Sequence, residues 1–311
     1  MKKPSFFVAV AAVATAMLSG SAMADLSFTP SNNADALVQA LLSDTAGITL
    51  VANSAVLVVP STGTPAGTFT GGNGILPFAE GVVLSSGNIA TLVGPNSSSS
   101  AGNPLGDPDD GDADLDAIAG SDTQDAATLS FSFIPVNNTI SFQFVFGSEE
   151  YNEFVGSLFN DVFAFFLNGE NIALLPGTNT VISINSVNNG NTEEPPPVPP
   201  SNPSYFFDNN SDGRNIELDG LVGVNNGFQL FATGSVTPGE VNTIKLAIAD
   251  VSDDIFDSAV FIKSGSFDDA PPPDQNPNPN PVVPLPLGAW MALGTLGGLG
   301  AVKKLRTRTG C

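Results

Sequence analysis

The sequence predicts an all-β protein, a two-sheet antiparallel sandwich of the jelly-roll kind with one short N-terminal helix. Many short segments alternate apolar and polar residues with a period of two, which is typical of strands. Glycine and asparagine, the residues of tight turns, separate these segments. The spacing of apolar residues that predicts a helix occurs once. Many strands with no second helical pattern favour two packed sheets.

A secretory signal peptide is predicted at residues 1–24. Lysines follow the initial methionine, an apolar run covers 6–18, and residues 22–24 read Ala-Met-Ala, the A-x-A pattern of a cleavage site. The apolar run is too short to cross a membrane, which disfavours the alternative of a membrane helix. We therefore expect an exported protein whose folded part lies outside the cytoplasm.

Residues 25–270 are expected to form one β-sandwich domain. Its helix is predicted because Ala34, Leu37, Val38, Leu41 and Leu42 recur at helical spacing after the possible caps at 31–33. The predicted strands cover 48–59, 81–87, 128–134, 139–147, 162–169, 179–185, 227–236, 241–250 and 258–267. Their alternation predicts sheets with one buried face. The proline-rich segment 191–203 is predicted to be a surface loop, because proline cannot join a central strand.

The C-terminal part divides into a stalk and an anchor. Residues 271–282 are rich in proline and asparagine, which favours an extended polyproline II stalk. In 283–311 a sixteen-residue apolar run at 287–302 precedes four basic residues. Such a run is a marginal membrane span, since about 17 to 25 residues are usual, and the basic cluster would stay in the cytoplasm.

This pattern resembles the C-terminal sorting signals of the PEP-CTERM and VPLPA-CTERM type, which exosortase-like enzymes process at the cell surface. The letters VPLP at 283–286 match the second type, although Leu287 stands where an alanine is usual. The resemblance implies an exosortase-type enzyme as a partner and membrane contact through this segment before processing. A plain membrane anchor is the alternative.

The charge distribution excludes nucleic acid as a partner. Of the nine basic residues only Arg214, Lys245 and Lys263 lie between the signal peptide and the C-terminal segment, together with all 31 acids. The exported body therefore carries a formal charge of −28. A field of this sign repels nucleic acid and anionic lipid, and it attracts cations.

The missing residue types restrict the chemistry. The chain has no histidine, and its single cysteine is Cys311 in the C-terminal tail. A Ser-His-Asp or Cys-His catalytic site is therefore impossible, and the body has no disulfide. It also lacks the soft ligands that zinc and copper prefer. If a metal binds, oxygen ligands make Ca²⁺ the leading candidate.

Acidic residues follow the ends of several predicted strands. Glu149, Glu150 and Asp161 lie between two aromatic strands, and Asp250 and Asp257 bracket a later turn. Because loops cluster at the ends of a sandwich, these acids are expected to converge, and converging carboxylates repel unless a cation or a proton intervenes. With few internal counterions, a bound divalent cation resolves this repulsion. The alternative is that each acid faces water or caps a turn separately.

A weaker candidate lies at 107–120. Asp110, Asp112 and Asp114 occupy alternate positions, as in a calcium-binding loop. The EF-hand pattern is incomplete, because Gly111 is misplaced and no glutamate stands at the twelfth position. The alternative is a solvated acidic loop.

Several stretches together resemble a known family. FGSEEYNEFVGSLFNDVFAFFLNG at 146–169, DADLDAIAG at 112–120 and IADVSDDIFDSAVF at 248–261 are similar to the choice-of-anchor L domain of bacterial surface proteins, over about 33–267. The resemblance carries no established activity. The strand arrangement looks similar to CUB-type sandwiches, in which one Glu and two Asp bind calcium. That analogy implies Glu149 or Glu150, Asp161 and Asp257 as ligands, with Asp250 possible.

These observations predict an exported, surface-anchored, non-enzymatic protein that is stabilised by Ca²⁺ and acts in adhesion, extracellular matrix or envelope contact. The expected location is the cell surface, outer envelope or extracellular matrix of a Gram-negative bacterium, and the expected partner is an unidentified surface component or polysaccharide. A calcium-dependent carbohydrate-binding module is one alternative. A glycoside hydrolase using Glu150 and Asp161 is another. It is disfavoured because the body has no tryptophan and only Tyr151 and Tyr205 to line a sugar cleft.

Overall fold

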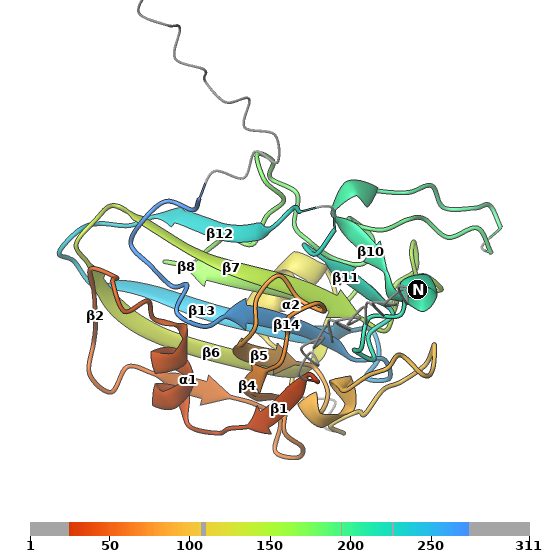
Figure 1. Cartoon of the computed structure of the whole chain (residues 1–311), viewed down its shortest axis with the longest axis horizontal. Helices are drawn as coiled ribbons and strands as arrows, with labels where there is room; N and C mark the ends of the chain where they lie inside the picture. The colour runs from red at the N-terminus through yellow and green to blue at the C-terminus, as the bar shows by residue number, and fades with distance from the viewer. Residues whose placement is uncertain (1–24, 107–109, 194, 226, 274–311) are drawn as a thin grey trace, which may run out of the picture. The chain divides into compact units, whose positions relative to one another are not determined.

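The structure is a computed structural model that describes residues 25–106, 110–193, 195–225 and 227–273. It confirms the predicted all-β sandwich, since two antiparallel sheets carry most of the regular structure (Figure 1). The predicted signal peptide, most of the stalk and the whole C-terminal segment lie outside the described residues. No helix within the described ranges is long and apolar enough to cross a membrane.

The first sheet has the strand order β1-β4-β5-β14-β7-β11-β10, and β12 also pairs with β7. Its strands are β1 (Ser27–Pro30), β4 (Ala66–Thr70), β5 (Gly81–Ser85), β7 (Thr139–Ser148), β10 (Phe206–Asp208), β11 (Gly220–Val222), β12 (Leu230–Ser235) and β14 (Ser258–Lys263). Strand β7 is central, because it pairs with β14 on one side and with both β11 and β12 on the other.

The second sheet has the order β2-β6-β13-β8-β9, with β3 also paired to β6. Its strands are β2 (Ile48–Leu50), β3 (Val56–Val58), β6 (Thr123–Pro135), β8 (Val162–Leu167), β9 (Glu170–Asn171) and β13 (Asn242–Val251). The helices are α1 (Ala34–Leu41), α2 (Ala113–Ala119) and α3 (Asn209–Asp212), with 3₁₀ turns η1 (Ile89–Leu92) and η2 (Pro203–Tyr205).

Phenylalanine side chains fill the space between the sheets. Phe142, Phe144 and Phe146 of β7 point inward at period two, and they meet Phe163 and Phe165 of β8 with ring centroids 4.9–5.6 Å apart. Each such ring buries about 150–250 Å² and prefers the tilted and edge-on contacts seen here. The alternation in the sequence therefore predicts this inner face correctly.

The outer faces of the central strands are also buried, which corrects the prediction of one buried face. On the first sheet Val145 of β7 packs outward with Phe69 and Phe261 in a second apolar cluster. On the second sheet α2 covers β8 and β13, and Leu115 of this helix is fully buried there. The outer faces of both sheets are therefore covered. In the second sheet this cover leaves every residue of β8 buried.

Two predicted segments need correction, and one helix was not predicted. Segment 48–59 forms two short strands, β2 and β3, that pair with different parts of β6. Segment 179–185 is no strand and makes only isolated bridges. Helix α2 was not predicted, because Leu115 is its only fully buried residue and it has no apolar stripe. The surface loop at 191–203 is confirmed, since its described prolines are exposed.

Candidate metal centre at one rim of the sandwich

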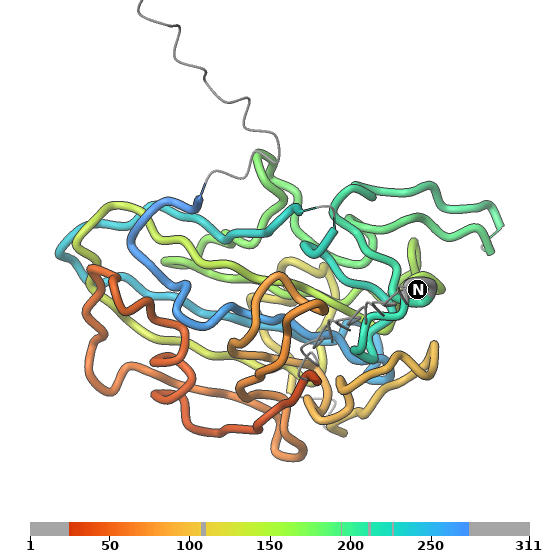
Figure 2. The backbone as a smooth tube through the Cα atoms, in the orientation of Figure 1, coloured from red at the N-terminus to blue at the C-terminus, as the bar shows by residue number. Residues whose placement is uncertain are grey.

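Four loop segments meet at one end of the sandwich, which we call the acidic rim: residues 86–106, 149–161, 213–219 and 252–257 (Figure 2). The backbone N–H of Glu149 donates to the carbonyl oxygen of Asp257 at 3.1 Å. The N–H of Asn103 donates to Asp257 Oδ2 at 3.0 Å. Segments far apart in the sequence are therefore in direct contact here.

Strand register places three acids in one row across the first sheet. Ser148 of β7 pairs with Ser258 of β14, so the next position puts Glu149 beside Asp257. On its other side Ser148 pairs with Gly220 of β11, so the next position puts Asp219 beside Glu149. Side chains directly opposite each other have Cβ atoms about 4.5–5.5 Å apart, and like charges in such positions are destabilising.

A second row of acids forms where strands β8 and β13 of the second sheet meet the acidic rim. Ala249 of β13 pairs with Val162 of β8, so Asp250 and Asp161 lie opposite each other. Asp161 is held by two donors: Ser258 Oγ at 2.6 Å and the Val251 N–H at 3.1 Å. Because Ser258 belongs to the first sheet, its hydroxyl joins the two rows. The structure thus brings together acids that the sequence only suggested would converge.

The five predicted ligands are buried: Glu149, Glu150, Asp161, Asp250 and Asp257 are each 1–2 % exposed. The alternative in which they face water is therefore wrong for these residues. Within strict hydrogen-bond geometry, both oxygens of Glu149 and of Asp250 lack a partner, as do Glu150 Oε2 and Asp257 Oδ1; the Ala101 backbone near Glu149 and the Ser86 side chain near Asp250 offset only part of the cost of burial. Burying an ionised carboxylate without a partner is costly, so these groups need a proton or a cation.

Glu149 and Glu150 are both affected by burial, but different acidic side chains lie next to each. Burial raises the pKa of Glu149 to about 10, with further contributions from the negative charges of Asp219 and Glu217. Burial likewise raises the pKa of Glu150 to about 9, and here the next cause is the charge of Asp161. Neighbouring residues in the chain therefore face different acidic partners.

The three aspartates show the same direction of shift. Burial raises the pKa of Asp161 to about 7 against the opposing hydrogen bonds from Ser258 and Val251. It raises the pKa of Asp257 to about 7 and that of Asp250 well above its usual value, the latter also because of Asp161. All five carboxyl groups thus resist ionisation unless positive charge is supplied.

Three buried or nearly buried acids at the rim were missed: Asp125, Glu217 and Asp219. Burial raises the pKa of Asp219 to about 7. Asp125 has a positive φ of 49° and accepts the N–H of Leu105 at 2.7 Å. Glu217 and Asp219 alternate directly before a short apolar strand, a pattern that would have pointed to them had β11 been recognised.

A glycine makes room for one of the carboxylates. A Cβ atom at Gly87 would lie 1.9 Å from Asp257 Oδ2, so the side chain of Asp257 occupies the space that any larger residue would need. At Gly102 a Cβ atom would lie 1.6 Å from the carbonyl oxygen of Ile255. The 86–106 segment can therefore approach the β13–β14 loop closely only because these positions lack side chains.

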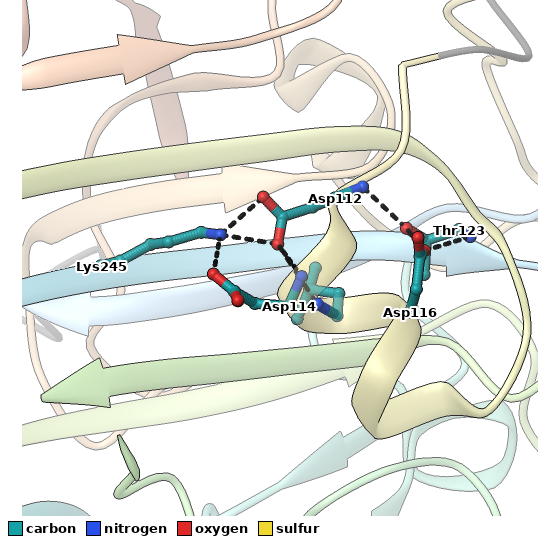
Figure 3. Close-up of polar contacts among 6 residues, drawn as sticks. Asp112, Asp114, Asp116, Thr123 and Lys245 are labelled. Atoms are coloured by element: carbon teal, nitrogen blue, oxygen red, sulfur yellow. Dashed lines mark hydrogen bonds and ion pairs between the residues drawn. The ribbon is translucent and has the colours of Figure 1, made fainter. Parts of the chain in front are cut away.

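The weaker candidate at Asp110, Asp112 and Asp114 is arranged differently from a calcium loop. Lys245 Nζ lies 2.6 Å from Asp112 and 2.7 Å from Asp114 (Figure 3). Asp112 also caps α2 by accepting the N–H groups of Asp114 and Leu115. Two of the three carboxylates are thus already neutralised by a lysine, and the expected convergence of three oxygens on one point does not occur.

The chemical groups that the rim offers a ligand are carboxylate oxygens. As the side chains stand, no three or more histidine, cysteine, aspartate or glutamate residues in the described part of the chain are grouped to hold a metal ion. Coordination therefore requires the carboxylate side chains to rotate from the positions that they occupy here. Glu150 and Asp161, the carboxylate pair considered for sugar hydrolysis, are each 1 % exposed, so a polysaccharide does not reach them.

The comparisons with known proteins identify the family. The profile of the choice-of-anchor L domain matches residues 27–268, which agrees with the range expected from the sequence. No curated protein matched the chain, and no solved structure matched it. The family is not an enzyme family, and its members are surface-associated or exported proteins. The matched range covers most of the sequence, so the chain belongs to the choice-of-anchor L domain family.

Proposed function

We propose that this protein is a surface-anchored, non-enzymatic module whose sandwich is closed at the acidic rim by Ca²⁺, and that it acts in adhesion, extracellular matrix or envelope contact. One observation carries the proposal. Five carboxyl groups from distant parts of the chain are buried at one rim, and most of their oxygens have no hydrogen-bond partner.

Calcium suits the rim because every available ligand is oxygen and the geometry is irregular. Ca²⁺ takes 6–8 oxygen ligands in a flexible arrangement, whereas zinc prefers imidazole and thiolate. An ion bound between the rows would join β7 and the β13–β14 loop of the first sheet to β8 and β13 of the second. It would therefore stabilise the contact between the sheets where their edges meet.

The size of this stabilisation follows from mass action. If the ion binds only the folded chain, a hundredfold excess of Ca²⁺ over Kd contributes about 2.7 kcal/mol. For a domain of this size each kcal/mol shifts Tm by about 2–4 °C, so chelation is expected to lower Tm by about 5–11 °C.

The test compares thermal unfolding of the purified protein with Ca²⁺ and with a chelator, together with elemental analysis for bound calcium. Asp250→Asn should clearly reduce the difference between the two conditions, because it removes a ligand from the row shared with Asp161. Asp254→Asn is the matched control, because Asp254 lies in the loop that follows β13 and is only partly buried. An identical Tm in both conditions, with no calcium in the protein, would contradict the calcium part of the proposal.

Anchoring is a separate part of the proposal. The sorting-signal pattern at 283–311 supports attachment through an exosortase-type enzyme after export through the signal peptide. Surface labelling of cells that express the full chain and a chain lacking 283–311 tests it. Release of the shortened chain into the medium is the expected result, and equal retention of both would contradict it.

A calcium-dependent carbohydrate-binding module is the second candidate, supported by a polar pocket close to the rim. This pocket of about 330 Å³ is lined by amides and acids with no aromatic ring: Asn152, Glu153, Asn189, Gly190, Asn191, Thr192, Glu193, Asp208 and Asn210. Such groups suit hydroxyls rather than stacked sugar rings. A glycan array in Ca²⁺, repeated with chelator, tests it, and calcium-independent or absent binding would contradict it.

A further inference from the structure

The acidic rim divides into two groups of carboxylates. Successive residues of an extended chain point in opposite directions, which separates Glu149 from Glu150. The strongest like-charge neighbour of Glu149 is Asp219, followed by Glu217. For Glu150 it is Asp161, which lies opposite Asp250 in the second sheet. A single cation bound by Asp161 and Asp250 would therefore leave the negative charge of Glu149 without a counterion.

The group around Glu149 is built by tertiary contacts. The segment at 96–97 holds both of its partners: Asn96 Nδ2 donates to Asp219 Oδ1 at 2.6 Å, and Ser97 donates to Glu217 Oε1 through its N–H at 3.1 Å and its Oγ at 3.0 Å. These contacts orient the two carboxylates. Asp219 Oδ2 is left without a hydrogen-bond partner. Both carboxylate oxygens of Glu149 also lack one by the same geometry.

The unpartnered atoms are deeply buried. Glu149 is 2 % exposed and Asp219 is fully buried, and the strand register places them opposite each other on β7 and β11. Glu217 is 7 % exposed. Lys245 pairs with Asp112 and Asp114 of the α2 segment, so its positive charge is engaged away from this group.

We propose that the rim holds a second divalent cation, Ca²⁺, bound by Glu149, Glu217 and Asp219. The inference rests on the proposed function, because it uses the same rim and the same ion. It moves Glu149 out of the first site, which keeps Glu150, Asp161 and Asp250. Asp257 lies beside Glu149 in the strand register and also acts on Asp250, so it stands between the two groups. Asn96 and Ser97 are positioning residues: Asn96 holds Asp219 Oδ1 and leaves Oδ2 for the ion, and Ser97 contacts both oxygens of Glu217 and fixes the orientation of that carboxylate.

The test counts bound calcium by elemental analysis of the dialysed full chain and follows Ca²⁺ binding by calorimetry. The wild type is expected to bind two ions. Asp219→Asn is expected to bind one, and Asp250→Asn is also expected to bind one. The Asp219→Asn/Asp250→Asn double variant should bind none. Circular dichroism shows whether each variant is folded.

Two results separate this inference from the proposed function. If the wild type binds one ion, which is lost in Asp250→Asn and kept in Asp219→Asn, the second site is refuted while the first stands. If no form binds calcium, both are refuted. Should Asp219→Asn fail to fold, Ser97→Ala keeps every charge and removes only the hydroxyl donor that helps to orient Glu217. It is expected to weaken one of two binding events by about tenfold, and unchanged affinities would overturn the inference.

Discussion

The metal-free protein should lose stability as the pH rises from 5 to 8, the reverse of the usual behaviour of carboxylates. In most proteins carboxyl groups are paired in the folded state, so their pKa falls on folding and acid destabilises the protein. Here burial raises the pKa of Asp161, Asp219 and Asp257 to about 7 and those of Glu149 and Glu150 to about 10 and 9.

The sign follows from proton binding. A raised pKa means that the folded chain binds these protons more tightly than the unfolded chain does. The stability contributed by the protonated forms is complete below the unfolded pKa values near 4, and it decreases as the pH rises towards the folded values. Each net proton contributes about 1.4 kcal/mol per pH unit. One net proton between pH 5 and 7 therefore amounts to about 3 kcal/mol, or about 6–12 °C in Tm.

Thermal unfolding in chelator at pH 5, 6, 7 and 8, followed by circular dichroism, measures this decrease. Saturating Ca²⁺ should flatten it, because the ion binds the deprotonated ligands and is favoured as the pH rises. Glu149→Gln removes one titrating group and should reduce the slope, whereas Glu240→Gln changes an exposed acid in a turn and should not. A Tm that increases from pH 5 to 7 in chelator would refute the reasoning.

Two further predictions concern single residues. Gly87→Ala should destabilise the protein by about 1–3 kcal/mol and reduce the calcium-dependent gain in Tm, because the added methyl group displaces the carboxylate of Asp257; an unchanged calcium response would contradict this role. Lys245→Gln should lower Tm by about 2–4 °C through the loss of its pairing with Asp112 and Asp114, without altering the effect of chelator. Lys263→Gln, an exposed lysine at the end of β14, is the matched control, and a larger chelator effect in Lys245→Gln would instead indicate an ion bound by Asp112 and Asp114.

Much of the fold could be predicted because local pattern and tertiary structure agree along the central strands. Phe142, Phe144 and Phe146 alternate in the sequence and pack together between the sheets. The pattern failed where burial is two-sided or strands are short. Val145 is as deeply buried as its neighbours, and β11 has only three residues, too few to show a period.

The candidate site was predicted in part. The sequence indicated five acids near strand ends, and the structure buries all five at one rim. It did not indicate Asp219, whose place opposite Glu149 depends on pairing between strands that are about seventy residues apart in the chain. It also suggested a calcium loop at Asp112 and Asp114, whose charges are compensated by a lysine 131–133 residues away.

The sequence by itself determined the class of fold, the excess of negative charge and the chemistry of any ligand, because composition and period are local properties. A chain without histidine offers only oxygen ligands in its body, whatever its fold. Only the tertiary structure decided which carboxylates share a site and which meet a lysine. The reason is that strand register and sheet packing bring distant residues together, and the burial they impose turns ordinary acids into groups that require a cation or a proton.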